Sequence, residues 1–294
     1  MQRRKLAWQA LNKALRVRQQ HGVDVTDAVD IFDFVAGLDI EVRFVDMPSL
    51  EAMYVKAERS KILVSSHRPP GRRVFNCAHE LGHHVFNHGT KIDEYLESGQ
   101  QQQERTDPEE TIANRFASYF LMPKTLVAHA FNCRGWSPAT SSPLHFYTVA
   151  GWLGVGYSTL IYQMRDSLRL LGRPKAAALL KRSPKELRAQ LLGQSEQRHL
   201  TIVDLHWKDR AIDTHVEDLI LVPPGTNFEG DCVQRVPYHG EGTLYRAVTP
   251  GIGRFVHPRS GWASYTRIAK QDYIGRSIYR YLPDPEYVIS AALH

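Results

Sequence analysis

CAHELGHHVF, the stretch from Cys77 to Phe86, holds the most informative pattern in this sequence. It contains the motif H-E-x-x-H, with His79 and His83 four residues apart. On a helix, residues four apart lie one turn above each other on one face, so both imidazoles can reach a single metal ion. The motif therefore predicts a metal site on a helix.

The residues around this motif have the spacing of a helix. Val74, Ala78, Leu81 and Val85 form one apolar stripe. The preceding turn, HRPPGRR at residues 67–73, has two prolines and a glycine that are expected to break regular structure. We therefore expect the helix to begin at about Val74 and to end at Gly89.

Two histidines do not complete a catalytic metal site. Zn²⁺ binds nitrogen at about 2.0–2.1 Å, and a catalytic site has three protein ligands and an open position for water. The longer motif with a third histidine would need glycine where Phe86 stands and histidine where Gly89 stands. A carboxylate from a second helix is therefore the expected third ligand. Glu80 is the expected catalytic base, which takes the proton of the attacking water.

The second helix is expected to begin where Thr106 or Asp107 can cap it and to run to Met122, with Pro108 in its first turn. The polar segment before it, residues 97–106, is expected to be a mobile loop.

Glu109 and Glu110 both lie in the first turn of this helix, and the apolar periodicity allows either to face the core. Asn114 favours Glu110, because it lies one turn further on and its side chain could orient that ligand. Ala113, one turn after Glu109, could not. We therefore predict His79, His83 and Glu110 as ligands, with Asn114 behind Glu110.

The bulk properties predict folded protein in a reducing compartment. The 294 residues are 43% hydrophobic and 23% charged, the balance of a globular protein. No apolar run of about 18 residues or export signal is found, and the three cysteines are odd in number, so a cytoplasmic protein without membrane contact is expected. The formal charge of +6 permits nucleic-acid contact but is spread along the chain.

The remaining patterns predict an α+β protein of three parts. Helices are expected at 6–20 and 29–36, and strands at 39–45 and 61–65. Ser183 to Glu186 has the form of a capping box that begins a helix to Leu192, and short β-rich runs follow from His199. The turn-rich segments suggest boundaries that divide the chain into residues 1–134, which carry the metal motif, a helical module at 135–195 and a β-rich domain at 196–294.

The segment from Ala150 to Leu160 has the small residues and central glycine of a helix-turn-helix. The polar side chains of its second helix and the residues just beyond it are Tyr157, Ser158, Thr159, Gln163 and Arg165. Few of these are base-reading types, so a packing role is favoured over DNA reading.

CAHELGHHVF followed by EETIANRFASYFLMP, from Glu109 to Pro123, resembles the ImmA/IrrE family of bacterial metallopeptidases. The resemblance implies a thermolysin-like zinc-peptidase core with a small sheet beside the H-E-x-x-H helix, and Glu110 as third ligand. It also implies site-specific cleavage of a helix-turn-helix transcriptional repressor in a stress or mobile-element response. The order of the three parts is similar to that of the IrrE-type stress-response regulators, in which a helical module and a sensor-like domain follow the peptidase. The resemblance therefore implies a metallopeptidase domain at 1–134, a helix-turn-helix-like module at 135–195 and a domain at 196–294 that senses a signal or binds a partner.

An alternative is a DNA-binding or antitoxin-type regulator with a non-catalytic metal site. A structural zinc would require four protein ligands, and Glu80 would then be free to vary. His and carboxylate ligands also accept Mn²⁺, so the pattern does not select zinc alone.

Overall fold

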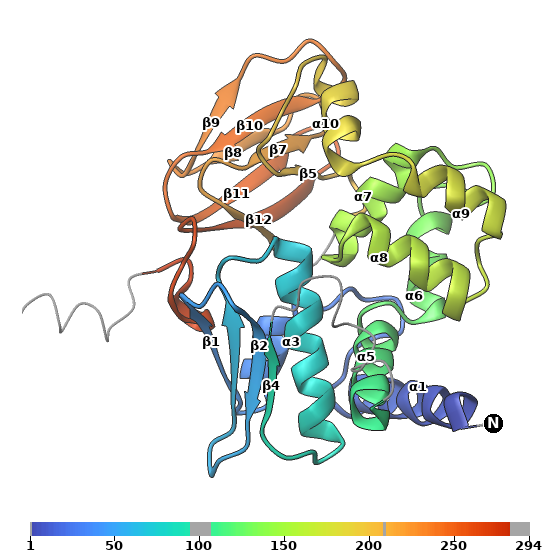
Figure 1. Ribbon diagram of the computed structural model, residues 1–294. Coiled ribbons are helices and arrows are strands. Elements are labelled where there is room, and N and C mark those ends of the chain that lie inside the picture. Colours follow the sequence, from blue (N-terminus) through green and yellow to red (C-terminus); the bar gives the residue numbers. More distant parts are fainter. Residues whose placement is uncertain (1, 95–106, 208–209, 283–294) are drawn as a thin grey trace, which may run out of the picture. The chain divides into compact units, whose positions relative to one another are not determined.

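The computed structural model describes residues 2–94, 107–207 and 210–282, and combines helices with three β-sheets (Figure 1). The chain folds into two compact units. The first contains residues 1–130, 153–156 and 274–278, and the second contains residues 131–152, 157–273 and 279–294. The α+β class predicted from the sequence is confirmed. In the described part of the chain, no helix combines the length and the hydropathy needed to cross a bilayer.

The first unit holds a five-stranded sheet with the order β13-β1-β3-β2-β4. Its strands are β1 (Glu41–Val45), β2 (Leu50–Val55), β3 (Lys61–Ser65), β4 (Lys91–Glu94) and β13 (Gly275–Arg276). β1 and β3, the two strands expected from the sequence in this unit, pair in parallel, whereas β2 and β4 were not predicted. β13 lies within one of the short β-rich runs expected after His199. β13 pairs with β1 although more than two hundred residues separate them, which no local pattern could indicate.

Two helices of this unit begin at a capping aspartate. The helices of the first unit are α1 (Gln2–Gln20), α2 (Ile31–Ala36), α3 (Pro70–Val85) and α5 (Pro108–Leu121). Helix α6 (Lys124–Asn132) begins in the first unit and ends in the second. Asp30 caps α2, and Asp107 caps α5 by accepting a hydrogen bond of 2.8 Å from the backbone of Glu109. The helix expected to end before Pro123 is confirmed, and the loop expected at 97–106 lies outside the described residues.

The bounds predicted for α3 were wrong at both ends. The helix begins at Pro70, because a proline at the first helical position needs no hydrogen-bonded N–H and has a φ suited to a helix. It ends at Val85 because Asn87, not Gly89, adopts the left-handed conformation, with φ of 59°.

A buried polar group joins α3 to the sheet. Glu51 of β2 is 8% exposed, forms an ion pair with Arg68 at 3.1 Å, and accepts hydrogen bonds from Arg72 at 2.8 Å and from the amide of Asn76 at 2.8 Å. Arg72 and Asn76 lie in the first turns of α3. Charge-assisted hydrogen bonds of this kind are stronger than neutral ones, so they set the position of the helix against β2.

The second unit contains a helical part and a β-rich part. Its helices are α7 (Pro143–Leu153), α8 (Tyr157–Tyr162), a π-helical turn (Gln163–Ser167), α9 (Arg173–Leu180) and α10 (Pro184–Leu192). The capping box predicted at Ser183 is present. The backbone N–H of Glu186 donates to the hydroxyl of Ser183, and the backbone N–H of Ser183 donates to the carboxylate of Glu186. The tyrosine hydroxyl of Tyr147 donates to the carbonyl of Leu200 at 2.7 Å and so links α7 to the first strand that follows the helices.

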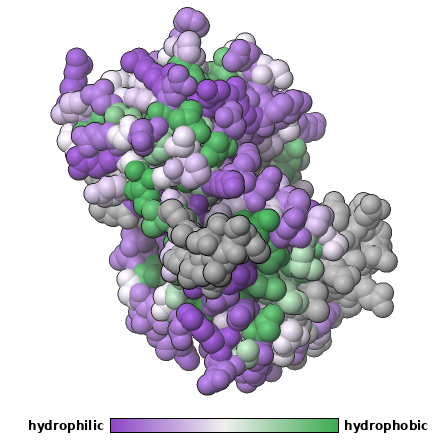
Figure 2. Space-filling view, turned by 90° about the vertical axis from the view of Figure 1, so that its left-hand side faces the viewer, coloured by the Kyte–Doolittle hydropathy of each residue, from purple (hydrophilic) through white to green (hydrophobic). Residues whose placement is uncertain are grey.

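Two four-stranded sheets form the β-rich part, as expected of the region after His199. Their orders are β5-β7-β10-β9 and β6-β12-β11-β8. The strands are β5 (Leu200–Ile202), β6 (Ile212–His215), β7 (Leu219–Val222), β8 (Asn227–Glu229), β9 (Val233–Val236), β10 (Thr243–Ala247), β11 (Gly251–His257) and β12 (Trp262–Ala269), and a 3₁₀ turn (Ser277–Tyr279) comes after β13. Tyr245 and Phe255, one from each sheet, pack with ring centroids 5.2 Å apart. On the face drawn in Figure 2, polar residues predominate and hydrophobic residues form separate groups.

Candidate metal site

Helices α3 and α5 bring three potential metal ligands together. His79 and His83 lie on one face of α3, and Glu110 lies in the first turn of α5. The Nε2 atoms of the two histidines are 2.9 Å apart, and Oε2 of Glu110 is 3.1 Å from Nε2 of His79. Oε1 of Glu110 is 3.5 Å from Nε2 of His83. One ligand atom from each residue lies within 4.8 Å of the others, so the group could hold a metal ion.

These distances fit the coordination sphere of a small divalent metal. Two ligands at about 2.0–2.1 Å from a tetrahedral ion are about 3.3–3.4 Å apart, by the geometry of zinc sites. The separations of 2.9, 3.1 and 3.5 Å lie on both sides of this value. Two imidazole nitrogens and a carboxylate oxygen are also the donor set of several catalytic zinc sites. The residues present therefore fit a metal without rearrangement of either helix.

The group is shielded from solvent. His79 is 4% exposed and His83 is fully buried. Burial alone would raise the pKa of Glu110, but hydrogen bonds and the charges of the two histidines outweigh it and hold that pKa well below its usual range. A carboxylate that stays ionised can serve as an anionic metal ligand.

Glu80, the expected base, follows His79 on α3 and is fully buried. Glu109, the other candidate ligand, is exposed at the surface of α5. Asn114 is also exposed, and in the described part of the chain no hydrogen bond links it to the three-residue group. Its role in orienting Glu110 therefore stays a prediction.

Gly82 allows the two helices to approach closely at the site. A Cβ atom at this position would lie 3.0 Å from Cα and 3.2 Å from the carbonyl oxygen of Ala113. Ala113 is one turn after Glu109 and three residues after Glu110. A larger residue at position 82 would therefore separate α3 from the helix that carries the carboxylate. The sequence pattern alone did not indicate this role for Gly82.

Residues 36–164 match the model of the peptidase M78 family, described as the IrrE N-terminal-like domain. The matched segment contains β1, α3 and α5, and so contains all three residues of the group. This segment of the chain is therefore similar to an IrrE N-terminal-like domain. The match supports peptidase or regulatory activity as a property of the family.

One solved structure similar to this chain is a Mycobacterium tuberculosis transcriptional regulator, with 17% sequence identity and a TM-score of 0.35. The similarity covers 57% of this chain and 49% of that structure, so this chain spans about half of its length. No curated protein matches the sequence.

Residues 36–164 also contain a further histidine, His88, in contact with the group. Nδ1 of His88 is 2.8 Å from Nδ1 of His83. His88 lies three residues beyond the end of α3, so helical spacing did not indicate it. The signal in the sequence is Asn87, a residue type that tolerates the left-handed conformation and can reverse the chain after a helix.

Proposed function

We propose that this protein is a zinc-dependent metallopeptidase. The observation that carries the proposal is the convergence of His79, His83 and Glu110 beside a fully buried glutamate, Glu80. Support also comes from the match of residues 36–164 to a peptidase family. Three protein ligands are the number that catalytic zinc sites provide, and Mn²⁺ is accepted by the same donor types.

Each residue then has a chemical task. The two imidazoles and the Glu110 carboxylate would hold the ion, and a bound zinc ion would supply a water of lowered pKa and polarise the scissile carbonyl. Glu80 accepts the proton of the attacking water and passes it to the leaving amine. A buried carboxylate suits this task, because little solvent competes for its proton.

We further propose a regulatory role for the cleavage. The site would lie in a thermolysin-like core within the predicted domain at 1–134. The substrate would be a cytoplasmic helix-turn-helix repressor, cut at one site in a stress or mobile-element response. Residues 135–195 would form the helix-turn-helix-like module, and the β-rich domain at 196–294 would receive the signal or a partner. The basis of this finer assignment is the resemblance to IrrE-type regulators.

Glu80→Gln separates catalysis from metal binding. The wild type and the variant, each loaded with zinc or manganese, are incubated with a purified helix-turn-helix repressor of the same organism. We expect one discrete cut by the wild type and none by the variant, with equal metal content in both. Equal cleavage by the two proteins would exclude Glu80 as the base. A wild type that binds no metal would refute the proposal as a whole.

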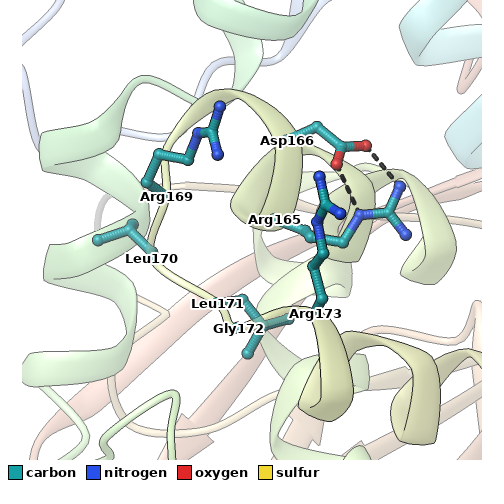
Figure 3. A pocket seen from close by; sticks show the side chains of 7 residues that line it. All are labelled: Arg165, Asp166, Arg169, Leu170, Leu171, Gly172 and Arg173. Atoms are coloured by element: carbon teal, nitrogen blue, oxygen red, sulfur yellow. Dashed lines mark hydrogen bonds and ion pairs between the residues drawn. The ribbon is translucent and has the colours of Figure 1, made fainter.

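A second candidate function is contact with the phosphates of DNA. Arg165, Arg169 and Arg173 line a cavity of about 360 Å³ between the π-helical turn and the start of α9 (Figure 3). Asp166 pairs with Arg165 at 2.6 Å, and these three guanidinium groups against one carboxylate leave a surplus of two positive charges. Arginine is well suited to phosphate oxygens.

The packing of α8 makes two of the expected base-reading side chains unavailable to DNA. Tyr157 and Gln163, two of the polar residues expected on a reading helix, are 5% exposed. The hydroxyl of Tyr157 donates to the carbonyl of Leu179 at 3.1 Å. Neither side chain is therefore available to a base edge, which supports the packing role favoured from the sequence.

The test is the affinity for a fluorescent DNA duplex over a range of salt concentrations. We expect the double variant Arg169→Ala, Arg173→Ala to weaken binding equally for unrelated sequences and to reduce the salt slope by about 2. Arg254→Ala in β11, also an exposed arginine, is the control. A wild type without measurable affinity at low salt would exclude this function.

A further inference from the structure

We infer that His88 is a positioning residue that orients the imidazole of His83 for metal binding. The inference rests on the proposed function of His83 as a ligand. Nε2 of His83 faces His79 and Glu110, so its lone pair is the one a metal would use. Nδ1 then carries the proton and donates it to Nδ1 of His88 at 2.8 Å.

The end of α3 brings His88 to this position. The backbone N–H of His88 donates to the carbonyl of His83 at 3.0 Å, and that of Asn87 donates to His84 at 3.0 Å. These two bonds, with Asn87 at φ of 59°, form a Schellman cap, which turns the chain back over the last turn of the helix. The cap therefore joins His88 to His83 through both backbone and side chain.

Aromatic contacts also hold the ring of His88. Phe86 stacks on it, with centroids 5.9 Å apart and planes 21° apart. Phe86 in turn packs edge-to-face on Phe116, at 6.2 Å. Phe116 is a fully buried residue of α5, the helix that carries Glu110. The contacts that hold His88 against His83 therefore reach α5, the helix that carries Glu110.

Two effects follow for metal binding. A fixed acceptor at Nδ1 selects the tautomer of His83 whose Nε2 can bind the metal, and it also restricts rotation of the ring. Loss of such an outer partner costs about 10–100-fold in metal affinity in other proteins. We expect the same range for His88.

The experiment measures zinc affinity of the full chain by competition with a chromophoric chelator. We expect His88→Ala to weaken binding about 10–100-fold while one zinc per chain still binds at saturation. His88→Gln retains an acceptor oxygen and is expected to bind zinc more tightly than His88→Ala but less tightly than the wild type. His84→Ala is the matched control, because His84 bonds the hydroxyl of Tyr54 at 3.0 Å and is not a member of the three-residue group.

The cap gives an independent variant that leaves His88 in place. Asn87→Val forces a β-branched residue into a left-handed conformation and is expected to weaken zinc binding, whereas Asn87→Gly is not. An unchanged affinity in both His88→Ala and Asn87→Val would overturn the inference. Complete loss of zinc in His88→Ala would also overturn it, since His88 would then be a ligand. Absence of zinc in the wild type would instead refute the proposed function and the inference with it.

Discussion

At the scale of single residues, two neighbouring glutamates provide a sharp comparison. Glu110 lies within 3.5 Å of both histidines, whereas Glu109 is exposed on the same turn. We expect Glu110→Gln to reduce zinc affinity by more than about 100-fold, because loss of a ligand costs more than loss of an outer partner. Glu109→Gln should leave it unchanged. Titration of both variants with zinc against a competing chelator measures this.

The opposite result, tight zinc binding without the Glu110 carboxylate, would mean that another residue supplies the third ligand. The helix dipole would then be the remaining reason for an acidic residue at this position in the first turn of α5.

At the scale of secondary structure, the contact between α3 and α5 at Gly82 controls the geometry of the site. Gly82→Ala places a Cβ atom 3.0 Å from Cα of Ala113, so the helices must move apart by a few tenths of an ångström. Overpacking costs about 1–3 kcal/mol, and alanine regains about 1 kcal/mol of helix propensity. We therefore expect weaker zinc binding with a net loss of stability below about 2 kcal/mol.

Gly151→Ala in α7 is the control for this substitution. A Cβ atom there would meet no atom within 4 Å, so the substitution should increase stability slightly and leave zinc affinity unchanged. Zinc affinity and urea unfolding of both variants separate the effect of the helix contact from helix propensity. Unchanged zinc affinity in Gly82→Ala would show that the close approach of the helices does not control the site.

The helical part of the second unit has its own test at high pH. Burial raises the pKa of Tyr157 to about 12 from an ordinary value of 10.0. The folded state therefore keeps a proton that the unfolded state loses, and the stabilising effect of Tyr157 is lost as the pH rises from 10 toward 12. Tyr157→Phe should be less stable than the wild type at pH 8, where it lacks the hydrogen bond to Leu179. The difference in free energy of unfolding between the two proteins should be smaller at pH 11. Urea unfolding at both pH values measures it.

At the scale of the whole molecule, a metal between α3 and α5 should stabilise one unit only. The three ligands and Gly82 all lie in the first unit. Anything that binds the folded state alone stabilises it, so removal of the metal should increase amide exchange in these helices. Strands β5 to β12 should keep their protection. Hydrogen exchange with and without a chelator measures this, and equal changes in both units would indicate that the units are coupled.

The sequence by itself determined the features that depend on neighbouring residues. The spacing of His79 and His83 predicts one helical face, and the capping box at Ser183 was found where expected, because both depend on contacts within about one turn. The parallel strands β1 and β3 also agreed with their patterns, since alternation and apolar runs are local properties.

The tertiary structure decided what depends on residues distant in the chain or on exact backbone angles. It brought Glu110 to the histidines and left Glu109 and Asn114 exposed, because α5 packs against both α1 and α3, with Ala113 close to Gly82. It paired β13 with β1. It also placed His88 against His83, since the left-handed turn at Asn87 reverses the chain after the helical periodicity has ended.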